Sequence, residues 1–168
     1  KEYLKCYENQ VLEDWYELIR HISVSETGEG IETCCDWIQK KMEEIGIQVT
    51  KYSVKPAPVL VGRFGNDPEK KTVLIYAHYD VKPAGERKLW HSDPFVPTVR
   101  DGKVYARGSA DNKSPLMAHL KALEYFVRKK MEVPVNVIFV FEGDEECGSR
   151  GLEEFLAEHR TELAADLV

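Results

Sequence analysis

Apolar residues follow a helical period at the start of the chain and a strand period after Gly46. They recur every three to four positions over residues 4–22, beginning with Leu4, and again over residues 31–45. This spacing predicts two helices that face a core, separated by a polar loop at residues 23–30. Gly46 stands where a C-terminal cap is expected, so it closes the second helix.

Eight further segments have the pattern of strands or helices. Strands are predicted at residues 47–52, 59–64, 72–77, 103–106 and 135–141 and beginning at Asp166, and helices at 115–130 and 149–158. The continuous apolar runs at 72–77 and 135–141 are typical of strands buried on both faces. A loop with Gly and Pro spans residues 81–97, and a loop of that length in a compact domain is often functional.

The order of these elements predicts the fold class. Helices that alternate with buried strands favour an α/β sandwich around a mostly parallel sheet. No repeat, low-complexity tract or linker interrupts residues 1–168, so the chain is interpreted as one domain. In such sheets, ligands bind beyond the carboxyl ends of the strands.

Composition and charge limit the classes of protein to which this chain can belong. The chain has 168 residues, of which 43% are hydrophobic and 31% charged, as in a globular domain. A net charge of -6 without a Lys/Arg block argues against nucleic acid or an anionic membrane as a partner. No apolar run reaches membrane-spanning length, and the start is not a signal peptide. Because the chain does not begin with Met, we expect a trimmed or truncated N-terminus.

The cysteines indicate the compartment. Cys6, Cys34, Cys35 and Cys147 form no CxxC pair, and a bridge between the adjacent Cys34 and Cys35 would be strained. We therefore expect free thiols in a reducing cytoplasm.

His78 and Asp80 follow the strand predicted at 72–77. Two positions apart on an extended segment, their side chains can point to the same side. A carboxylate that orients a metal-bound His is a common arrangement, whereas a solvated loop pair is the plainer interpretation.

Asp111 lies in a turn between a strand and a helix. Asp111, Asn112 or Ser114 could each cap the helix N-terminus. A carboxylate at this turn could equally bridge two metal ions, and the two roles are compatible.

Four acidic residues in five positions, Glu142, Asp144, Glu145 and Glu146, follow the strand predicted at 135–141. Like charges this close repel one another unless cations compensate. The segment is either a solvated acidic loop or a site in which Glu146 binds a metal and Glu145 serves as general base.

Dinucleotide binding and catalysis by a cysteine nucleophile have weaker support in the sequence. Gly28-Glu29-Gly30 follows a helix rather than a strand, so it fails the context of a dinucleotide-binding loop. Carboxylates beside Cys147 would disfavour its thiolate, which argues against a cysteine nucleophile.

Three long segments resemble one enzyme family. They read YAHYDVKPA at 76–84, GKVYARGSADNK at 102–113 and FEGDEECGS at 141–149, with Trp90 and the turn at 93–95 between the first two. The residues and the order of these motifs resemble the cocatalytic zinc metallopeptidase family of aminoacylases, succinyl-diaminopimelate desuccinylases and carnosinase-type dipeptidases. Within this family, the motifs resemble the dipeptidase branch most. The resemblance is strong over residues 73–155. Many relatives have Gly where this chain has Ala106 and Ser114.

The resemblance implies a role for each site residue. His78 would bind one of two divalent metal ions, Asp111 would bridge both and Glu146 would bind the second. Asp80 would be the accessory carboxylate and Glu145 the general base. Zinc is the expected metal, and manganese or cobalt could replace it. The implied fold is a three-layer α/β/α catalytic domain.

The family also has parts that we do not find in this sequence. A further carboxylate after the strand near Asp166, a late His and a lid domain that often mediates homodimer formation have no counterpart. We therefore expect the N-terminal portion of a catalytic domain. The implied substrate is a small peptide or an N-acyl amino acid. Three competing hypotheses are an N-acyl-amino-acid deacylase, a two-metal phosphoesterase and an inactive metal-binding fragment.

Overall fold

A computed structural model describes the backbone of residues 2–168, and all of their side chains except those of residues 2–4 and 6. The predictions for Leu4 and Cys6 lie outside the described side chains. The two N-terminal helices are confirmed as α1 (Glu2–Arg20) and α2 (Ile31–Ile45). Gly46 ends α2 in a left-handed conformation, with φ 94°, that a residue with a Cβ rarely adopts.

Four strands form the main sheet, in the order β1-β2-β6-β3. Their bounds are Gln48–Tyr52 for β1, Val59–Phe64 for β2, Thr72–His78 for β3 and Asn136–Glu142 for β6. Each lies within a residue or so of its predicted range. The α/β class is therefore confirmed.

The sheet is mixed, and the prediction of a mostly parallel sheet was wrong for the described strands. Only β3 and β6 pair in parallel, whereas β1 with β2 and β2 with β6 are antiparallel. The physical reason is the short connection between β1 and β2, which leaves no room for the crossover that a parallel pair needs.

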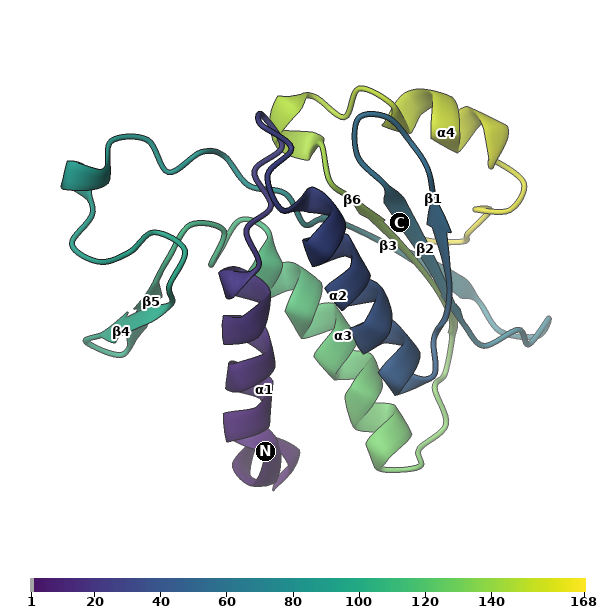
Figure 1. The fold of residues 1–168 in the computed structure, drawn as a ribbon. Helices are drawn as coiled ribbons and strands as arrows, with labels where there is room; N and C mark the ends of the chain where they lie inside the picture. The colour runs from purple at the N-terminus through teal and green to yellow at the C-terminus, as the bar shows by residue number, and fades with distance from the viewer. Residues whose placement is uncertain (1) are drawn as a thin grey trace.

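Two apolar clusters show that the domain has three layers (Figure 1). On one face of the sheet, side chains of α1, α2 and α3 (Lys113–Arg128) pack against the strands. On the other face, Phe155 of α4 (Leu152–Glu158) packs against Val59 and Val140. Burial of apolar side chains on both faces supplies most of the stabilisation of such a sandwich.

Strand β3 is less buried than predicted. β6 is buried along nearly its whole length, but in β3 only Ala77 and His78 are buried, and Tyr76 is exposed. The reason is the position of β3 beyond β6 in the sheet, where, among the residues that the structure describes, one short segment lies along its far side. There Leu167 forms a parallel bridge with Val73, as expected for a strand beginning near Asp166.

A long arm leaves the body between β3 and α3 (Figure 1). It contains the short helix η1 (Arg87–Leu89) and the hairpin of β4 (Thr98–Arg100) and β5 (Lys103–Tyr105). The strand predicted at 103–106 is thus confirmed as half of a hairpin. After β6 the chain forms the short helix η2 (Glu145–Cys147), so α4 begins three residues later than predicted.

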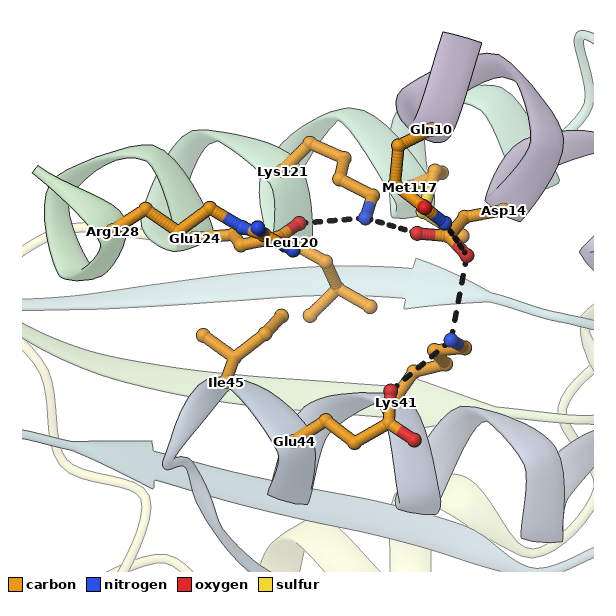
Figure 2. Close-up of a pocket in the computed structure, with 10 residues that line it drawn as sticks. All are labelled: Gln10, Asp14, Lys41, Glu44, Ile45, Met117, Leu120, Lys121, Glu124 and Arg128. Atoms are coloured by element: carbon orange, nitrogen blue, oxygen red, sulfur yellow. Dashed lines mark hydrogen bonds and ion pairs between the residues drawn. The ribbon is translucent and has the colours of Figure 1, made fainter. Parts of the chain in front are cut away.

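The three helices of the first layer are joined by an ion-pair network that lines a cavity of about 220 Å³ (Figure 2). Asp14 of α1 pairs with Lys41 of α2 at 3.3 Å and with Lys121 of α3, and Lys121 also pairs with Glu124 at 2.6 Å. Every charge shown in the network has a partner, so the cavity is interpreted as a structural feature of the helix layer.

Two further predictions concern the whole chain. Cys34, Cys35 and Cys147 are free, as expected. Among the described helices, none combines the length and the apolar composition needed to cross a membrane.

Candidate metal centre

The parallel pairing of β3 and β6 brings two of the predicted segments together. His78 is in register with Glu142, and the Tyr79 N–H donates to the Glu142 carbonyl at 2.8 Å. Because parallel strands end at the same edge of a sheet, the residues that follow each strand meet there. The site therefore lies at the carboxyl edge of the sheet, as predicted.

His78 is the centre of this cluster. Its Nδ1 lies 3.3 Å from Asp80 Oδ1 and 3.2 Å from the Asp80 carbonyl. Its Nε2 lies 3.1 Å from Asp111 Oδ1 and 3.7 Å from Glu145 Oε2. The two ring nitrogens thus have different partners: one is held by Asp80, and the other faces two carboxylates from separate segments.

Asp80 joins the two strand ends. It has no exposed surface, and its carboxylate accepts the backbone N–H groups of Glu145 at 3.2 Å and Glu146 at 3.0 Å. Since His78 is buried as well, the interpretation of these two residues as a solvated loop pair was wrong. Their prediction as neighbours on one side of the segment is confirmed.

The pKa values of this pair follow from its contacts. Burial alone raises the pKa of Asp80, but hydrogen bonds from His78, Ser25 and the Glu146 N–H outweigh it and lower the pKa. Burial alone lowers the pKa of His78, but the hydrogen bond and charge of Asp80, with the charge of Glu145, raise it to about 9. Both shifts have the same origin, since His78 and Asp80 stabilise each other's charge across their contact.

Asp111 is not a helix cap. α3 begins at Lys113, its cap residue is Asn112, and no side chain there forms a capping hydrogen bond. The Asp111 side chain is 76% exposed and points its carboxylate at His78. The N-cap interpretation was therefore wrong, because the turn directs this carboxylate toward the strand ends. The Asp111–Asn112 peptide bond is cis.

The acidic segment after β6 divides into two pairs. Glu142 and Asp144 are buried: Glu142 accepts hydrogen bonds from the Tyr76 and Ser149 hydroxyls, and Asp144 pairs with Arg150 at 2.6 Å. Burial raises the pKa of Glu142, against the two hydroxyl donors, which lower it. A solvated acidic loop was therefore the wrong interpretation of this segment.

The remaining pair, Glu145 and Glu146, faces different partners. Glu145 is 43% exposed and directs its carboxylate toward His78. Glu146 is 18% exposed, and its carboxylate lies 3.6 Å from Lys82 Nζ. Lys82 also donates to the Glu146 carbonyl. The structure thus brings His78, Asp80, Asp111 and Glu145 together. The Glu146 carboxylate forms no ion pair with His78 and instead lies close to Lys82.

The donor set has the chemistry of a divalent metal site, although the side chains do not form a closed one. Among residues 5 and 7–168, no three His, Cys, Asp or Glu side chains form a group that could hold an ion. However, an imidazole Nε2 and carboxylate oxygens converge from two segments, and these are ligands that zinc accepts. A carboxylate on the far ring nitrogen is the usual support of such a ligand. The side chains of His78, Asp111 and Glu145, with Asp80 supporting the imidazole, therefore fit a divalent metal ion.

Several residues with contacts to the site had no assigned role from sequence. Ser23 donates to the Tyr79 carbonyl at 2.7 Å, and the Cys147 thiol donates to Ser25 at 3.5 Å. Lys82 and Lys113 lie within the motifs that carry the family resemblance, which was the one available signal for them. The serines lie in a polar loop whose pattern gave no indication that it is buried against the strand ends.

Trp90 of the arm contacts other residues of the arm. Trp90 donates through Nε1 to the Ala84 carbonyl at 2.8 Å, and the Arg107 guanidinium lies 5.6 Å from the Trp90 ring centre. Trp90 therefore serves the packing of the loop itself.

Comparison with known proteins gives consistent matches. The family described as "Peptidase family M20/M25/M40" matches residues 74–168. The Cys-Gly metallodipeptidase dug1 of Schizosaccharomyces pombe is 43% identical over 120 residues, which are 69% of this chain and 25% of the relative. Human carnosine dipeptidase 1 superposes with a TM-score of 0.94 at 29% identity, over 99% of this chain and 39% of that structure.

A third match is the metallo-carboxypeptidase Sso-CP2 of Sulfolobus solfataricus, with a TM-score of 0.88 at 33% identity. It covers 94% of this chain and 36% of that structure. The chain therefore spans between a quarter and two fifths of the length of these relatives.

Proposed function

This chain belongs to peptidase family M20/M25/M40, and we propose that it is the N-terminal, metal-binding portion of a catalytic domain that hydrolyses dipeptides. The observation that carries the proposal is the arrangement around His78. Nε2 faces the carboxylates of Asp111 and Glu145, and Asp80 holds Nδ1. The dipeptide substrate is supported by the names of the relatives, which include a Cys-Gly metallodipeptidase and a carnosine dipeptidase.

We assign the metal ligands residue by residue. His78 would bind one of two divalent ions, Asp111 would serve both, and Glu146 would bind the second once its carboxylate turned away from Lys82. Zinc suits this set of nitrogen and oxygen donors, and the same donors accept manganese or cobalt. Such ions would supply Lewis acidity, which polarises a scissile carbonyl and lowers the pKa of an attacking water.

Glu145 is assigned as the general base. Its carboxylate is close to His78 but is only partly buried, so it can reach a water and a substrate beside the ligands. It takes a proton from the attacking water and later returns that proton to the leaving amine. Asp80 orients His78 through Nδ1 and, by accepting the N–H groups of Glu145 and Glu146, holds both carboxylates close to the imidazole.

The remaining assignments rest on the family resemblance. We propose a cytoplasmic enzyme that forms a homodimer through a lid domain, as the net charge of -6 and the free thiols Cys34, Cys35 and Cys147 allow. A deacylase of N-acyl amino acids would use the same residues in the same roles. A two-metal phosphoesterase would also draw on Asp, His and Glu side chains, and an inactive fragment would bind metal without turnover.

Replacing the base tests the mechanism. In the full-length gene product, Glu145→Gln should retain both metal ions and lose dipeptide hydrolysis by about 10²-fold or more, since the amide cannot accept the proton. Metal content by atomic emission and turnover of Cys-Gly and β-Ala-His measure the two effects. The matched control is Glu153→Gln on the exposed side of α4, which should behave as wild type. Turnover by Glu145→Gln near that of this control would contradict the role of Glu145.

A substrate panel separates the peptidase from the competing activities. We expect the zinc-loaded protein to cleave dipeptides faster than N-succinyl or N-acetyl amino acids, and to leave a phosphomonoester intact. Preferential cleavage of the acylated amino acids would identify a deacylase, and cleavage of the phosphomonoester would contradict the peptidase. Two bound metals with no turnover of any substrate would favour the metal-binding module.

A further inference from the structure

We propose that Lys113 is a positioning residue whose ammonium group fixes the Asp111 turn against the end of α1 and thereby sets the distance from Asp111 to His78. The inference deepens the proposed function, because it concerns the residue assigned as the bridging ligand. It is carried by four contacts that converge on residues 18–23, at the end of α1.

The first two contacts are those of the ammonium itself. Lys113 is 1% exposed, and its Nζ donates to the carbonyls of Leu18 at 3.1 Å and His21 at 2.6 Å. α1 ends at Arg20, so these carbonyls belong to the end of a helix, where the backbone lacks partners within the helix. Figure 1 shows that α1 ends beside the start of α3. The side chain therefore caps one helix from the first residue of another.

The same segment holds the other half of the site. Ser23 Oγ donates to the Tyr79 carbonyl at 2.7 Å, and the Val81 N–H donates to the Ser23 carbonyl at 2.8 Å. These two bonds flank Asp80 on either side. The end of α1 is thus attached to the His78–Asp80 segment through Ser23 and to the Asp111 turn through Lys113.

The turn before Asp111 has little room to move independently. The Lys113 N–H donates to the Gly108 carbonyl at 3.2 Å. A Cβ on Gly108 would lie 2.5 Å from Val81 Cγ1 and 3.5 Å from Lys113 Cδ. Gly108 is therefore confined between Val81 and the Lys113 stem, so a shift of Lys113 would move the turn against the segment that carries Asp80.

The chemistry of the contact explains why this position has a lysine. Both partners are carbonyls, so the side chain must be a donor without an acceptor, long enough to reach past Gly108. A buried ammonium is costly, and among the described residues Lys113 forms no direct ion pair, although the charge of Asp80 offsets part of that cost. A cation at the C-terminal end of a helix gains from the helix dipole, and an apolar side chain at this position would leave both carbonyls without this donor.

The test compares two lysines of α3. Lys113→Met keeps the volume and removes the donors. The control, Lys121→Met, removes a largely buried ammonium about 12 Å further along the same helix, where its partners are Asp14 and Glu124. Hydrogen exchange of the amides of residues 79–81, 108–114 and 116 is measured in the metal-free full-length protein. Co²⁺ affinity and the visible spectrum of the Co²⁺ form are measured alongside the free energy of unfolding.

We expect both variants to lose stability. Only Lys113→Met should accelerate exchange at 108–114 and 116 beyond the global change, weaken Co²⁺ binding by about 10- to 100-fold and alter the spectrum. Lys113→Gln keeps a shorter donor and should give an intermediate loss of Co²⁺ affinity. It takes the place of the methionine variant if that variant does not fold. Exchange and Co²⁺ affinity equal to those of Lys121→Met would overturn the inference. If wild type bound no Co²⁺, the proposed function would fail, and the exchange data alone would decide the role of Lys113.

Discussion

The carboxylate of Asp80 accepts hydrogen bonds from two consecutive backbone N–H groups and contacts His78 Nδ1, all without any exposed surface. A carboxylate is the one side chain that can accept all of these bonds at once, because an ionised Asp has acceptors only. At the scale of single residues, the site therefore depends on a group that is not itself assigned to a metal. Burial without these donors would raise the pKa of Asp80, and the donors keep it charged.

Asp80→Asn should weaken metal binding by about 10- to 100-fold, because the amide turns one acceptor into a donor that faces a backbone N–H group. Isothermal titration with Zn²⁺ measures the loss. Asp101→Asn is the matched control: Asp101 is exposed in the β4–β5 turn with φ 51°, a conformation that Asn tolerates. Wild-type affinity in Asp80→Asn would show that Asp80 does not support the ligands.

At the scale of elements, the helix layer is held by charge as well as by apolar packing. Asp14 connects α1 to both α2 and α3 through Lys41 and Lys121 (Figure 2). Burial alone raises the pKa of Asp14, but its hydrogen bonds and ion pairs with Lys121 and Lys41 outweigh this and lower the pKa. The folded state therefore binds a proton at Asp14 less readily than the unfolded chain does.

This shift predicts how stability depends on pH. Since the folded pKa lies below the unfolded value of about 3.9, the contribution of Asp14 is complete above that pH and is lost as the pH falls through the folded pKa. Asp14→Asn should cost about 1–3 kcal/mol at pH 7, a cost that shrinks below about pH 4. Urea unfolding at several pH values measures it. Glu8→Gln, on an exposed part of α1, should show no such dependence, and a cost for Asp14→Asn that stays constant with pH would contradict the assignment.

At the scale of the whole molecule, the site is assembled from three parts of the chain that meet at one sheet edge. His78 ends β3, Glu145 and Glu146 follow β6, and Asp111 returns from the arm just before α3. An ion bound to these residues would cross-link the parts in the folded state only. Metal binding should therefore stabilise the molecule by mass action.

Zinc at about 100 times its dissociation constant should raise the free energy of unfolding by about 2.7 kcal/mol relative to the chelator-treated protein. Thermal unfolding of the full-length protein, with and without added Zn²⁺, measures this as a rise in Tm. His78→Ala should abolish the rise, and His91→Ala, an exposed residue of the arm, should retain it. An equal rise in both variants would place the zinc elsewhere.

Much of the fold was predictable because it is encoded locally. The stripes of α1 and α2, the cap at Gly46 and the apolar runs of β3 and β6 depend on residues within a few positions of one another. The same holds for the location of the candidate residues, since each follows a strand or precedes a helix. The direction of the strands was not predicted correctly, because the short β1–β2 connection permits only an antiparallel pair.

The sequence by itself therefore determined the elements, the family and the residue types available for a metal centre. Only the tertiary structure decided which of them meet: that Asp111 points at His78 rather than capping α3, that Glu146 lies on Lys82, and that Lys113 reaches the end of α1. The physical reason is separation along the chain. Lys113 and His21 are brought together by strand register and helix packing, which no local period of apolar residues encodes.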